Sequence, residues 1–453
     1  MKLAIVGAGW AGLAAAVEAA DGGHQVTVFE SAHTLGGRAR RVERPWMGIT
    51  LDNGQHILLS AYRHTLALMQ RLGQNPDARF QRLKLNLQAL DGRYRLTLAN
   101  APAPWHLVGG LLRAQGLCWQ DKWQLARAMQ HMQRRGWQVA PAGITLHDWL
   151  DRHCPSAVLY QHFWQPLCLA AMNTPVEHAC AQLFANVLRD SLGHSREACD
   201  MLLPRTDLSD LWPDHVRQTT WHHAGGSVNI RTGHTVRNIQ TADATSGHAL
   251  RVEDEHFDGL ILACSPPSCT RLLNAITVPD GAETTASKLL ATLGAFDFNP
   301  IATLTLVLEQ PWALPAPMLM LREQREREHF GQWLFNWPDF RPDSQRPVLQ
   351  IVISDAAQAA HLGAPRVYEG VMAQLRAQTA SSCPPMPAVI DYRMIVEKRA
   401  TFTARAGLAR PDNTTPWPGV WLAGDWTDTG YPGVLEGAVR SGQQAARAAM
   451  QGT

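Results

Sequence analysis

The feature that most constrains the fold is a glycine-rich segment near the start of the chain, Gly7-Ala8-Gly9-Trp10-Ala11-Gly12. It directly follows the apolar residues 2–6, which have the composition of a buried strand. It precedes the alanine-rich residues 13–20, which favour a helix. The G-x-G-x-x-G spacing therefore lies where a strand turns into a helix N-terminus, and unpaired N–H groups with the helix dipole favour a pyrophosphate there.

The residues of this segment have distinct expected roles. Gly7 permits the tight turn, Gly9 lets the pyrophosphate approach the backbone, and Gly12 lets the helix pack closely on the strand. Trp10 and Ala11 lie between the second and third glycines of the motif. We assign all five residues to cofactor binding.

A second apolar run, residues 25–29, ends at Glu30, about twenty residues after the glycines. A carboxylate at this position can accept hydrogen bonds from a ribose diol, and an acid rather than an arginine argues against a ribose 2′-phosphate. We assign the adjacent Ser31 to the same site. Strand, helix, second strand and acid together predict a dinucleotide-binding unit.

The segment Gly36-Gly37-Arg38 follows the acid. With the preceding motif it resembles the FAD-dependent amine oxidase and carotenoid desaturase superfamily, in which a turn of this type places an arginine near the cofactor. The resemblance implies that the cofactor is FAD and that Gly37 and Arg38 contribute to its site. Taken alone, the three residues are also compatible with a solvated loop.

A second cofactor segment lies near the end of the sequence. Residues 421–423 form an apolar run that leads into Gly424 and Asp425, and residues 430–442 open a helix of small residues. A helix N-terminus beside a flavin can stabilise negative charge on the reduced ring. Asp425 can bind the ribityl chain or reach the pyrophosphate through water, although a helix-capping role is the alternative. The C-terminal flavin motif of the superfamily is similar, and by this resemblance we add Gly433, Val434 and Leu435 to the site. Residues 222–239 resemble the region where the superfamily chain returns to the FAD domain, which implies that the backbone of Val236 holds the adenine.

Candidate catalytic residues lie in the segment Asp52-Asn53-Gly54-Gln55-His56-Ile57. Members of the superfamily have a similar segment that returns beside the flavin ring, which implies that Gly54 contacts the cofactor. We nominate His56 as the proton donor, with Gln55 and Asp52 as its hydrogen-bonding partners. The alternative is that His56 is a packed histidine at a strand end.

Periodicity predicts the remaining elements. Helices are expected at residues 61–72, 160–171 with a break at Pro166, and 179–192, and a β-hairpin around Asp91-Gly92 within residues 80–98. Strands are expected at residues 257–264, 301–309 and 347–354, and the aromatic-rich residues 331–337 between the last two are expected to be buried.

These elements predict an α/β protein in which a Rossmann-type FAD-binding domain is interleaved with an α+β substrate domain of mixed sheet and helices. The FAD-binding domain is expected to comprise residues 1–78, 204–272 and 396–453. The substrate domain is expected to comprise the helical residues 79–203 and the sheet-forming residues 273–395.

Composition excludes several classes of protein. The 453 residues carry a formal net charge of +2, which gives no reason to expect a nucleic-acid partner. The eight cysteines include no C-x-x-C pair, and His222, His223 and His234 lack suitably spaced partners, so no metal site is expected. The cysteine pattern and the absence of a long apolar stretch favour a reduced, cytoplasmic setting.

Residues 102–140 combine Trp105, Trp119, Trp123 and Trp137 with several arginines. Amphipathic helices of this composition can lie in a membrane interface, which would place the protein at the periphery of the inner membrane. They can equally bury their aromatic side chains around a substrate pocket.

Three segments together, residues 1–20, 51–69 and 422–442, resemble the bacterial hydroxysqualene dehydroxylase family, also called squalene-associated FAD-dependent desaturases. The resemblance implies reduction of the long-chain isoprenoid hydroxysqualene to squalene for hopanoid synthesis, with an electron donor that the sequence does not identify. Two alternatives stay open. One is a desaturase or oxidase of another isoprenoid or an amine, and the other is a non-enzymatic lipid carrier, since Rab escort and dissociation-inhibitor proteins have this architecture.

Overall fold

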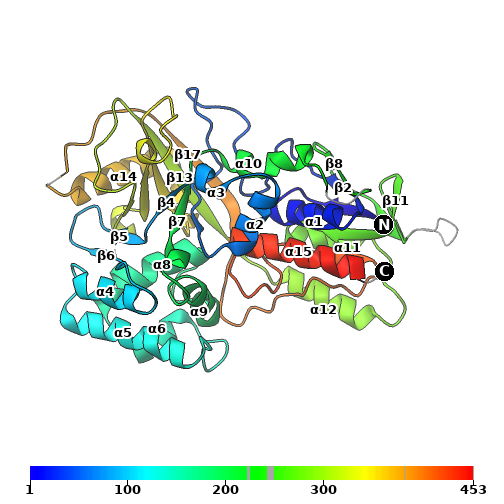
Figure 1. Ribbon diagram of the computed structural model, residues 1–453, viewed down its shortest axis with the longest axis horizontal. Helices are drawn as coiled ribbons and strands as arrows, with labels where there is room; N and C mark the ends of the chain where they lie inside the picture. The colour runs from blue at the N-terminus through cyan, green and yellow to red at the C-terminus, as the bar shows by residue number, and fades with distance from the viewer. Residues whose placement is uncertain (222–224, 242–248, 382, 452–453) are drawn as a thin grey trace.

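A computed structural model describes residues 1–221, 225–241, 249–381 and 383–451. Figure 1 shows a part built around a parallel sheet, where both chain ends lie, next to a part built from an antiparallel sheet and a group of helices. Segments from distant stretches of sequence meet in both parts. The expected α/β class with an interleaved parallel-sheet unit is confirmed.

The parallel sheet has the strand order β18-β12-β1-β2-β8. Its pairings are all parallel, and β1 lies in the centre between β12 and β2. The bounds of these strands are β1 Lys2–Val6, β2 Gln25–Phe29, β8 Ser227–Arg231, β12 Gly259–Leu262 and β18 Val420–Leu422. The strand expected at residues 257–264 is thus shorter, because Phe257 belongs to a different strand, β11.

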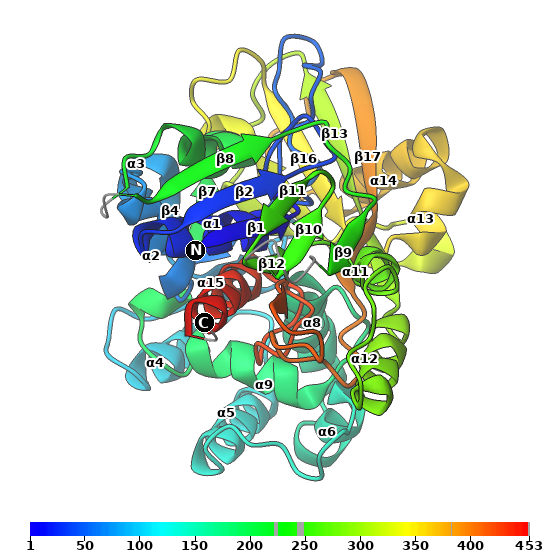
Figure 2. The ribbon, with the colours of Figure 1, turned by 90° about the vertical axis from the view of Figure 1, so that its right-hand side faces the viewer.

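The two faces of β1 pack against different layers, because successive side chains of a strand point to opposite faces. Leu3 and Ile5 share a core with helices α1 (Trp10–Asp21) and α15 (Leu435–Gln451). Ala4 and Val6 belong to a core on the other side, together with a three-stranded sheet of β9 (Ile239–Thr241), β10 (Leu250–Val252) and β11 (Glu255–Phe257) (Figure 2). The glycine-rich turn thus lies in a packed three-layer sandwich.

The second large sheet has the order β14-β15-β16-β13-β17. Its bounds are β13 Phe298–Leu308, β14 Met318–Met320, β15 Trp333–Asn336, β16 Val348–Ile353 and β17 Val389–Phe402. The pairings among these strands are all antiparallel, where we expected a mixed sheet. The difference arises because β14, β15 and β16 follow one another along the chain and pair as consecutive antiparallel neighbours.

This antiparallel sheet also has two faces. Leu304 and Leu306 of β13 pack under helices α13 (Ala357–Leu362) and α14 (Ala364–Gln378). Trp333 and Phe335 of β15 belong to the core on the opposite side. That side faces the parallel-sheet part.

The helical region contains α4 (Trp105–Arg113), α5 (Trp119–Arg134), α6 (Leu146–His153), α7 (Ala157–Leu159), a π-helical turn (Tyr160–Trp164), α8 (Gln165–Met172) and α9 (Ala181–Asp190). Pro166 was expected to break a helix. It lies at the second residue of α8, just after the π-helical turn, so the helical run changes its hydrogen-bond pattern there and does not end.

The expected hairpin around Asp91-Gly92 is present only in part. Its strands are β5 (Asn86–Gln88) and β6 (Arg95–Thr97). The preceding residues of β4 (Phe80–Leu83) pair with β7 (Met201–Pro204), which also pairs with β3 (Leu58–Leu59). The alternating pattern of residues 80–83 was assigned to the hairpin, but this strand instead pairs with β7, more than a hundred residues later in the chain.

The expected helix at residues 61–72 is α2 (Arg63–Arg71). The remaining helices are α3 (Pro76–Arg79), α10 (Leu208–Leu211), α11 (Pro266–Leu273) and α12 (Glu283–Gly294). The domain boundaries expected after residues 203 and 395 fall inside β7 and β17, so these two strands link the parts. Within the described ranges, no helix has the length and apolarity needed to cross a bilayer.

Candidate active site

One continuous cavity of about 710 Å³ lies between the two parts. Fifteen of the sixteen residues assigned to cofactor binding line it: Gly7, Gly9, Trp10, Ala11, Glu30, Ser31, Gly37, Arg38, Gly54, Val236, Gly424, Asp425, Gly433, Val434 and Leu435. The sixteenth, Gly12, does not line the cavity. His56 and Gln55 also line the cavity.

The glycine-rich turn has the geometry that a pyrophosphate needs. A Cβ atom on Gly9 would meet only the Cα of Gly37, at 3.8 Å, and α1 starts there without a side-chain cap. Gly7 has a φ of +109°, and a Cβ on Gly12 would lie 1.9 Å from the carbonyl oxygen of Gly7. The helix start thus faces open space, and the two outer glycines are required by the turn and by close packing.

Glu30 is buried at the end of β2, and its carboxylate supports the turn. Oε2 accepts a hydrogen bond from the backbone N–H of Ala8 at 2.7 Å, and Oε1 accepts one from the N–H of Ala32 at 2.8 Å. A carboxylate has about four lone-pair sites, so capacity remains for a ribose diol. Glu30 therefore both shapes the glycine turn and faces the cavity.

Arg38 and Asp425 form an ion pair that joins the N-terminal and C-terminal flavin segments. Arg38 also donates to the carbonyl oxygen of Ala400 on β17 at 2.9 Å. Asp425 is buried, and Arg38 is partly exposed toward the cavity. Residues 387 positions apart thus close one side of the cofactor site.

Sequence reasoning missed Arg410, which holds the C-terminal segment in shape. Its guanidinium donates to the backbone carbonyls of Asp425 at 2.7 Å and Trp426 at 3.2 Å, and also to those of Thr427 and Tyr431. Burial lowers the pKa of this guanidinium to about 10, and the charges of Asp428 and Asp425 oppose that effect. A single arginine outside any motif gave no sequence signal for this role.

Away from the cofactor segments, the cavity becomes apolar. Helices α8 and α9, the β5–β6 hairpin and the antiparallel sheet supply its wall, including Leu85, Leu167, Phe184, Leu188, Met318 and Phe335. Such a wall suits a hydrocarbon chain.

Trp333 brings a polar group to this mainly apolar wall. Its side chain lines the cavity and is 5% exposed, and its indole N–H is buried without a hydrogen-bond partner among the described residues. Thr303 of β13 and Trp333 of β15 both pair with Val352 of β16. The hydroxyl of Thr303 is also buried without a hydrogen-bond partner among the described residues. Unpartnered buried polar groups are costly, so a ligand oxygen that reached either group would gain a hydrogen bond.

His56 is buried beside the cavity. Its Nδ1 lies 2.8 Å from the carbonyl oxygen of Gly54. A carbonyl only accepts, so Nδ1 carries the proton and the neutral ring has a free lone pair on Nε2. Burial lowers the pKa of His56; the hydrogen bond to Gly54 opposes this effect and the charge of Arg38 adds to it.

Gln55 holds the same segment through two contacts. Its side-chain amide donates to the carbonyl oxygen of His56 at 3.0 Å, and its Oε1 accepts from the indole N–H of Trp337 at 3.4 Å. Trp337 donates more closely, at 3.0 Å, to Gln350 of β16. The antiparallel sheet thus positions the His56 segment.

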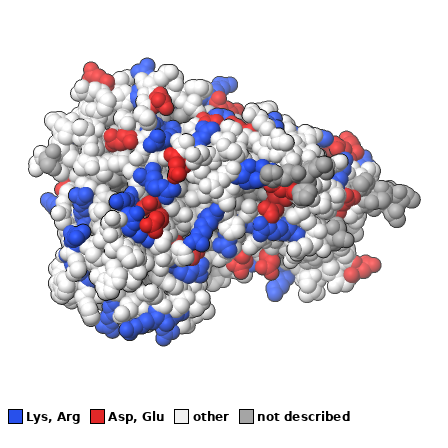
Figure 3. Space-filling view, viewed as in Figure 1, with Lys and Arg blue, Asp and Glu red and all other residues white. Residues whose placement is uncertain are grey.

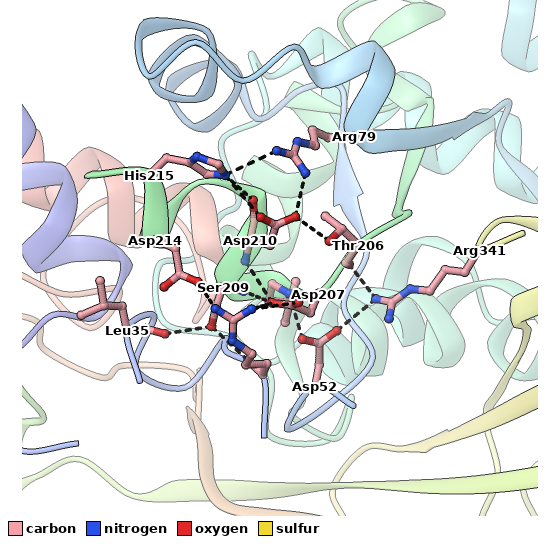
Figure 4. Close-up of polar contacts among 12 residues, drawn as sticks. Leu35, Asp52, Arg79, Thr206, Asp207, Ser209, Asp210, Asp214, His215 and Arg341 are labelled. Carbon is pink, nitrogen blue, oxygen red and sulfur yellow. Dashed lines mark hydrogen bonds and ion pairs between the residues drawn. The ribbon is translucent and has the colours of Figure 1, made fainter. Parts of the chain in front are cut away.

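Asp52 was expected to be a hydrogen-bonding partner of His56, and the structure corrects this. Its carboxylate accepts from Arg341 at 3.0 Å and from the backbone N–H of Leu208 at 2.8 Å, inside the polar network of Figure 4. Asp52 does not line the cavity. Burial raises its pKa to about 6 although the neighbouring Arg341 lowers it.

Arg341 connects this network to the cavity. It is 7% exposed, donates to the carbonyls of Pro204 at 3.0 Å and Thr206 at 2.9 Å, and lies 4.2 Å from the ring centre of Trp337. Arg341 packs on Trp337, and Trp337 donates a hydrogen bond to Gln55. Arg341 therefore supports the His56 segment through Trp337. The two residues of the ion pair are 289 positions apart, so the sequence contained no signal for the pairing.

No cluster of three or more metal-ligating side chains occurs in the part of the chain that the structure describes. His222 and His223 lie outside the described residues, and His234 lines the cavity. All eight cysteines are free.

Comparisons with known proteins agree with this site. The family model of flavin-containing amine oxidoreductases matches residues 10–450. The hydroxysqualene dehydroxylases of Rhodopseudomonas palustris and Zymomonas mobilis are 28% and 26% identical; each match covers 98% of this chain, with 96% and 98% of the relative. A probable zeta-carotene desaturase of Synechococcus elongatus is 25% identical, over 100% of this chain and 99% of the relative.

Solved structures show the same fold. An oxidoreductase from Methanosarcina mazei superposes with a TM-score of 0.70 at 15% identity, covering 99% of this chain and all of that one. A triple mutant of putrescine oxidase superposes with a TM-score of 0.69 at 16% identity, covering 100% and 99%. The resemblance to hydroxysqualene dehydroxylases and the assignment of FAD are thereby confirmed. The chain belongs to the family of flavin-containing amine oxidoreductases and is an FAD-dependent oxidoreductase.

Proposed function

We propose that the protein removes the hydroxyl group of hydroxysqualene reductively to give squalene, which then serves hopanoid synthesis. The observation that carries this proposal is the unpartnered indole N–H of Trp333, whose side chain belongs to the mainly apolar wall that continues from the flavin segments. A pure hydrocarbon would leave this N–H unpaired. A substrate hydroxyl would satisfy it.

The chemistry needs a hydride, a dry cavity and a proton. When bound, FAD in its reduced form supplies the hydride, which carries the two electrons and replaces the hydroxyl group. The apolar wall holds the hydrocarbon chain and excludes water, so that an allylic cation formed by loss of water is not recaptured. The third contribution is a proton for the leaving oxygen.

We assign that proton to Nε2 of His56. In the neutral ring this nitrogen accepts, so it can receive a hydrogen bond from the substrate hydroxyl; in the protonated ring it donates. Since burial lowers the pKa of His56, the donating form is present at low pH and is lost as pH rises through the lowered pKa. The carbonyl oxygen of Gly54 fixes the ring by accepting from Nδ1, and Gln55 fixes the backbone of His56 by donating to its carbonyl oxygen.

This assignment predicts the pH dependence of the reaction. The single-turnover rate is expected to rise as pH falls below His56's ordinary value of 6.5, and to level off below the lowered pKa. His56→Gln should lose this acidic limb and react about 100-fold more slowly. The exposed His33→Gln serves as control and should keep the limb. An acidic limb that persists in His56→Gln would assign the proton to another group.

The function itself is tested by an anaerobic single turnover of holoenzyme reduced with dithionite. Addition of hydroxysqualene is expected to reoxidise the flavin and to yield an equal amount of squalene. Trp333→Phe keeps the ring but loses the N–H, and a hydrogen bond worth about 1–1.5 kcal/mol corresponds to a rate about tenfold lower. Trp312→Phe is the control. The indole N–H of Trp312 donates to the carbonyl oxygen of Pro384, and its ring lies in the core on the other face of the sheet.

The second candidate is a desaturase or oxidase that moves hydride in the opposite direction. The similarity to a probable zeta-carotene desaturase supports it, and the apolar wall suits either kind of substrate. Reduced flavin that hydroxysqualene leaves unchanged, with oxidised enzyme bleached instead by an isoprenoid or an amine, would replace our proposal with this one.

A further inference from the structure

Exposed large apolar side chains are concentrated on two neighbouring helices. Seven such side chains occur in the described residues, and five of them lie on α4 and α5: Trp105, Val108, Leu112, Trp119 and Trp123. The three tryptophans are 64%, 68% and 62% exposed. We call these five residues the α4–α5 surface.

Helix geometry places these side chains on the outer face of each helix. Trp105, Val108 and Leu112 recur at helical spacing along α4, and Trp119 and Trp123 are one turn apart on α5. The inner faces are occupied by other residues, among them Leu111 of α4 and Leu125, Ala128 and Met129 of α5. The exposed side chains are therefore a second apolar stripe that the core of this chain does not use.

One contact brings the two stripes together. The Nζ of Lys122, next to Trp123 on α5, donates to the carbonyl oxygen of Leu112 at the end of α4, at 2.9 Å. The last turn of α4 thus lies against the first turns of α5. The α4–α5 surface is consequently one patch rather than two separate ones, and large exposed apolar patches mark interaction sites.

The exposed charges on the two helices of this patch have one sign. Residues 102–140 contain five lysines and arginines: Arg113, Lys122, Arg127, Arg134 and Arg135. The one carboxylate in this stretch, Asp121, is buried and accepts hydrogen bonds from the N–H of Cys118 and the hydroxyl of Ser156. Figure 3 shows lysine and arginine side chains without acidic neighbours at the lower left edge, over the region of these helices.

Indoles beside cations match the chemistry of a bilayer surface. The tryptophan ring is favoured at the level of lipid headgroups, where its apolar body and its N–H are both accommodated. Cationic side chains add attraction to anionic headgroups, which falls off within a Debye length. A protein partner would also cover the indoles, but the excess of cations over exposed carboxylates complements a surface of uniform negative charge.

We propose that the α4–α5 surface docks on a bilayer that contains anionic phospholipids. The tryptophans lie in the headgroup region and the surrounding arginines contact the lipid phosphates. This proposal rests on the exposed side chains and their charges, so it is independent of the reaction that the cavity catalyses.

Flotation of the FAD-loaded protein with vesicles tests the proposal. Wild-type protein is expected to float with phosphatidylcholine vesicles containing about one-third phosphatidylglycerol, and to be released by high salt. The variant Trp105→Ser/Trp119→Ser/Trp123→Ser should partition at least about tenfold more weakly. Ile390→Ser, which removes an exposed apolar side chain on β17, should bind normally.

A second pair of variants separates the charge contribution. Arg127→Glu/Arg134→Glu/Arg135→Glu should lose binding to anionic vesicles. Arg44→Glu/Lys288→Glu/Arg376→Glu, with the same change in net charge at exposed positions elsewhere, should keep most of it. Flavin absorbance shows that each variant is folded. Protein that stays at the bottom with anionic vesicles would overturn the proposal, as would a tryptophan variant that floats normally, or a wild-type dimer that the tryptophan substitutions convert to monomer.

Discussion

Purified Glu30→Arg protein is expected to be colourless. The substitution removes the acceptor of the Ala8 and Ala32 N–H groups, at 2.7 and 2.8 Å, and places a cation inside the turn that those bonds shape. It also leaves two backbone donors without their partner in a buried position. Loss of the charge-assisted hydrogen bond to a ribose alone corresponds to about tenfold to a hundredfold weaker FAD binding, and the distorted turn weakens it further.

The measurement is the ratio of flavin to protein absorbance after purification, followed by titration of apoprotein with FAD. Glu43→Arg is a matched control, because it reverses a charge on the same part of the chain at an exposed carboxylate that pairs only weakly with Arg40. The control should retain FAD at the wild-type ratio. A Glu30→Arg protein with normal colour and stoichiometry would refute the role assigned to this carboxylate.

Arg341→Met is expected to cost about 3–5 kcal/mol of unfolding free energy at pH 8, because it leaves the buried carboxylate of Asp52 without its cation. Arg341 also bonds the carbonyls of Pro204 and Thr206, which lose their donor. The neighbouring exposed Arg346→Met should change stability by no more than about 0.5 kcal/mol.

The pH dependence of this loss identifies its cause. Asp52 already has a folded-state pKa near 6, above its ordinary value of 3.8, and removal of Arg341 raises that pKa further. A raised carboxyl pKa means stability that is present at low pH and lost as pH rises through the folded-state pKa. The deficit of Arg341→Met should therefore grow between pH 5 and pH 8.

Denaturant titrations at these two pH values provide the measurement. Adding Asp52→Asn to Arg341→Met removes the ionisable group and should abolish the growth of the deficit with pH. An equal deficit at both pH values would mean that lost packing, rather than an unpaired carboxylate, accounts for the destabilisation.

Sequence reasoning predicted the local geometry correctly where it depends on local spacing. The three glycines at residues 7–12 lie directly between a strand and a helix, so the residues that determine the geometry of the turn are close together in the sequence. The helix that begins at Leu435 has the same property. Most residues predicted to bind the cofactor come from such segments, and they line one cavity.

It failed where the partner of a side chain lies far along the chain. Asp52 looked like a companion of His56 because it is four residues away, yet its actual partner is Arg341. Arg410 and the unpaired N–H of Trp333 acquire meaning only when the surrounding backbone is in place. The Phe80–Leu83 strand was misassigned for the same reason, since its neighbour β7 arrives more than a hundred residues later.

The order of strands in the parallel sheet also sets the order in which the molecule can be completed during translation. β1 is made first, but its neighbour β12 follows some 250 residues later and β18 after 420 residues. Helix α15, whose Gly442 lets it approach Ala11 of α1, is made last. The nascent chain thus carries an incomplete flavin site, with the apolar faces of β1 and α1 uncovered, until synthesis passes this helix. A complete flavin site therefore forms only after α15 has been synthesised and has packed against α1.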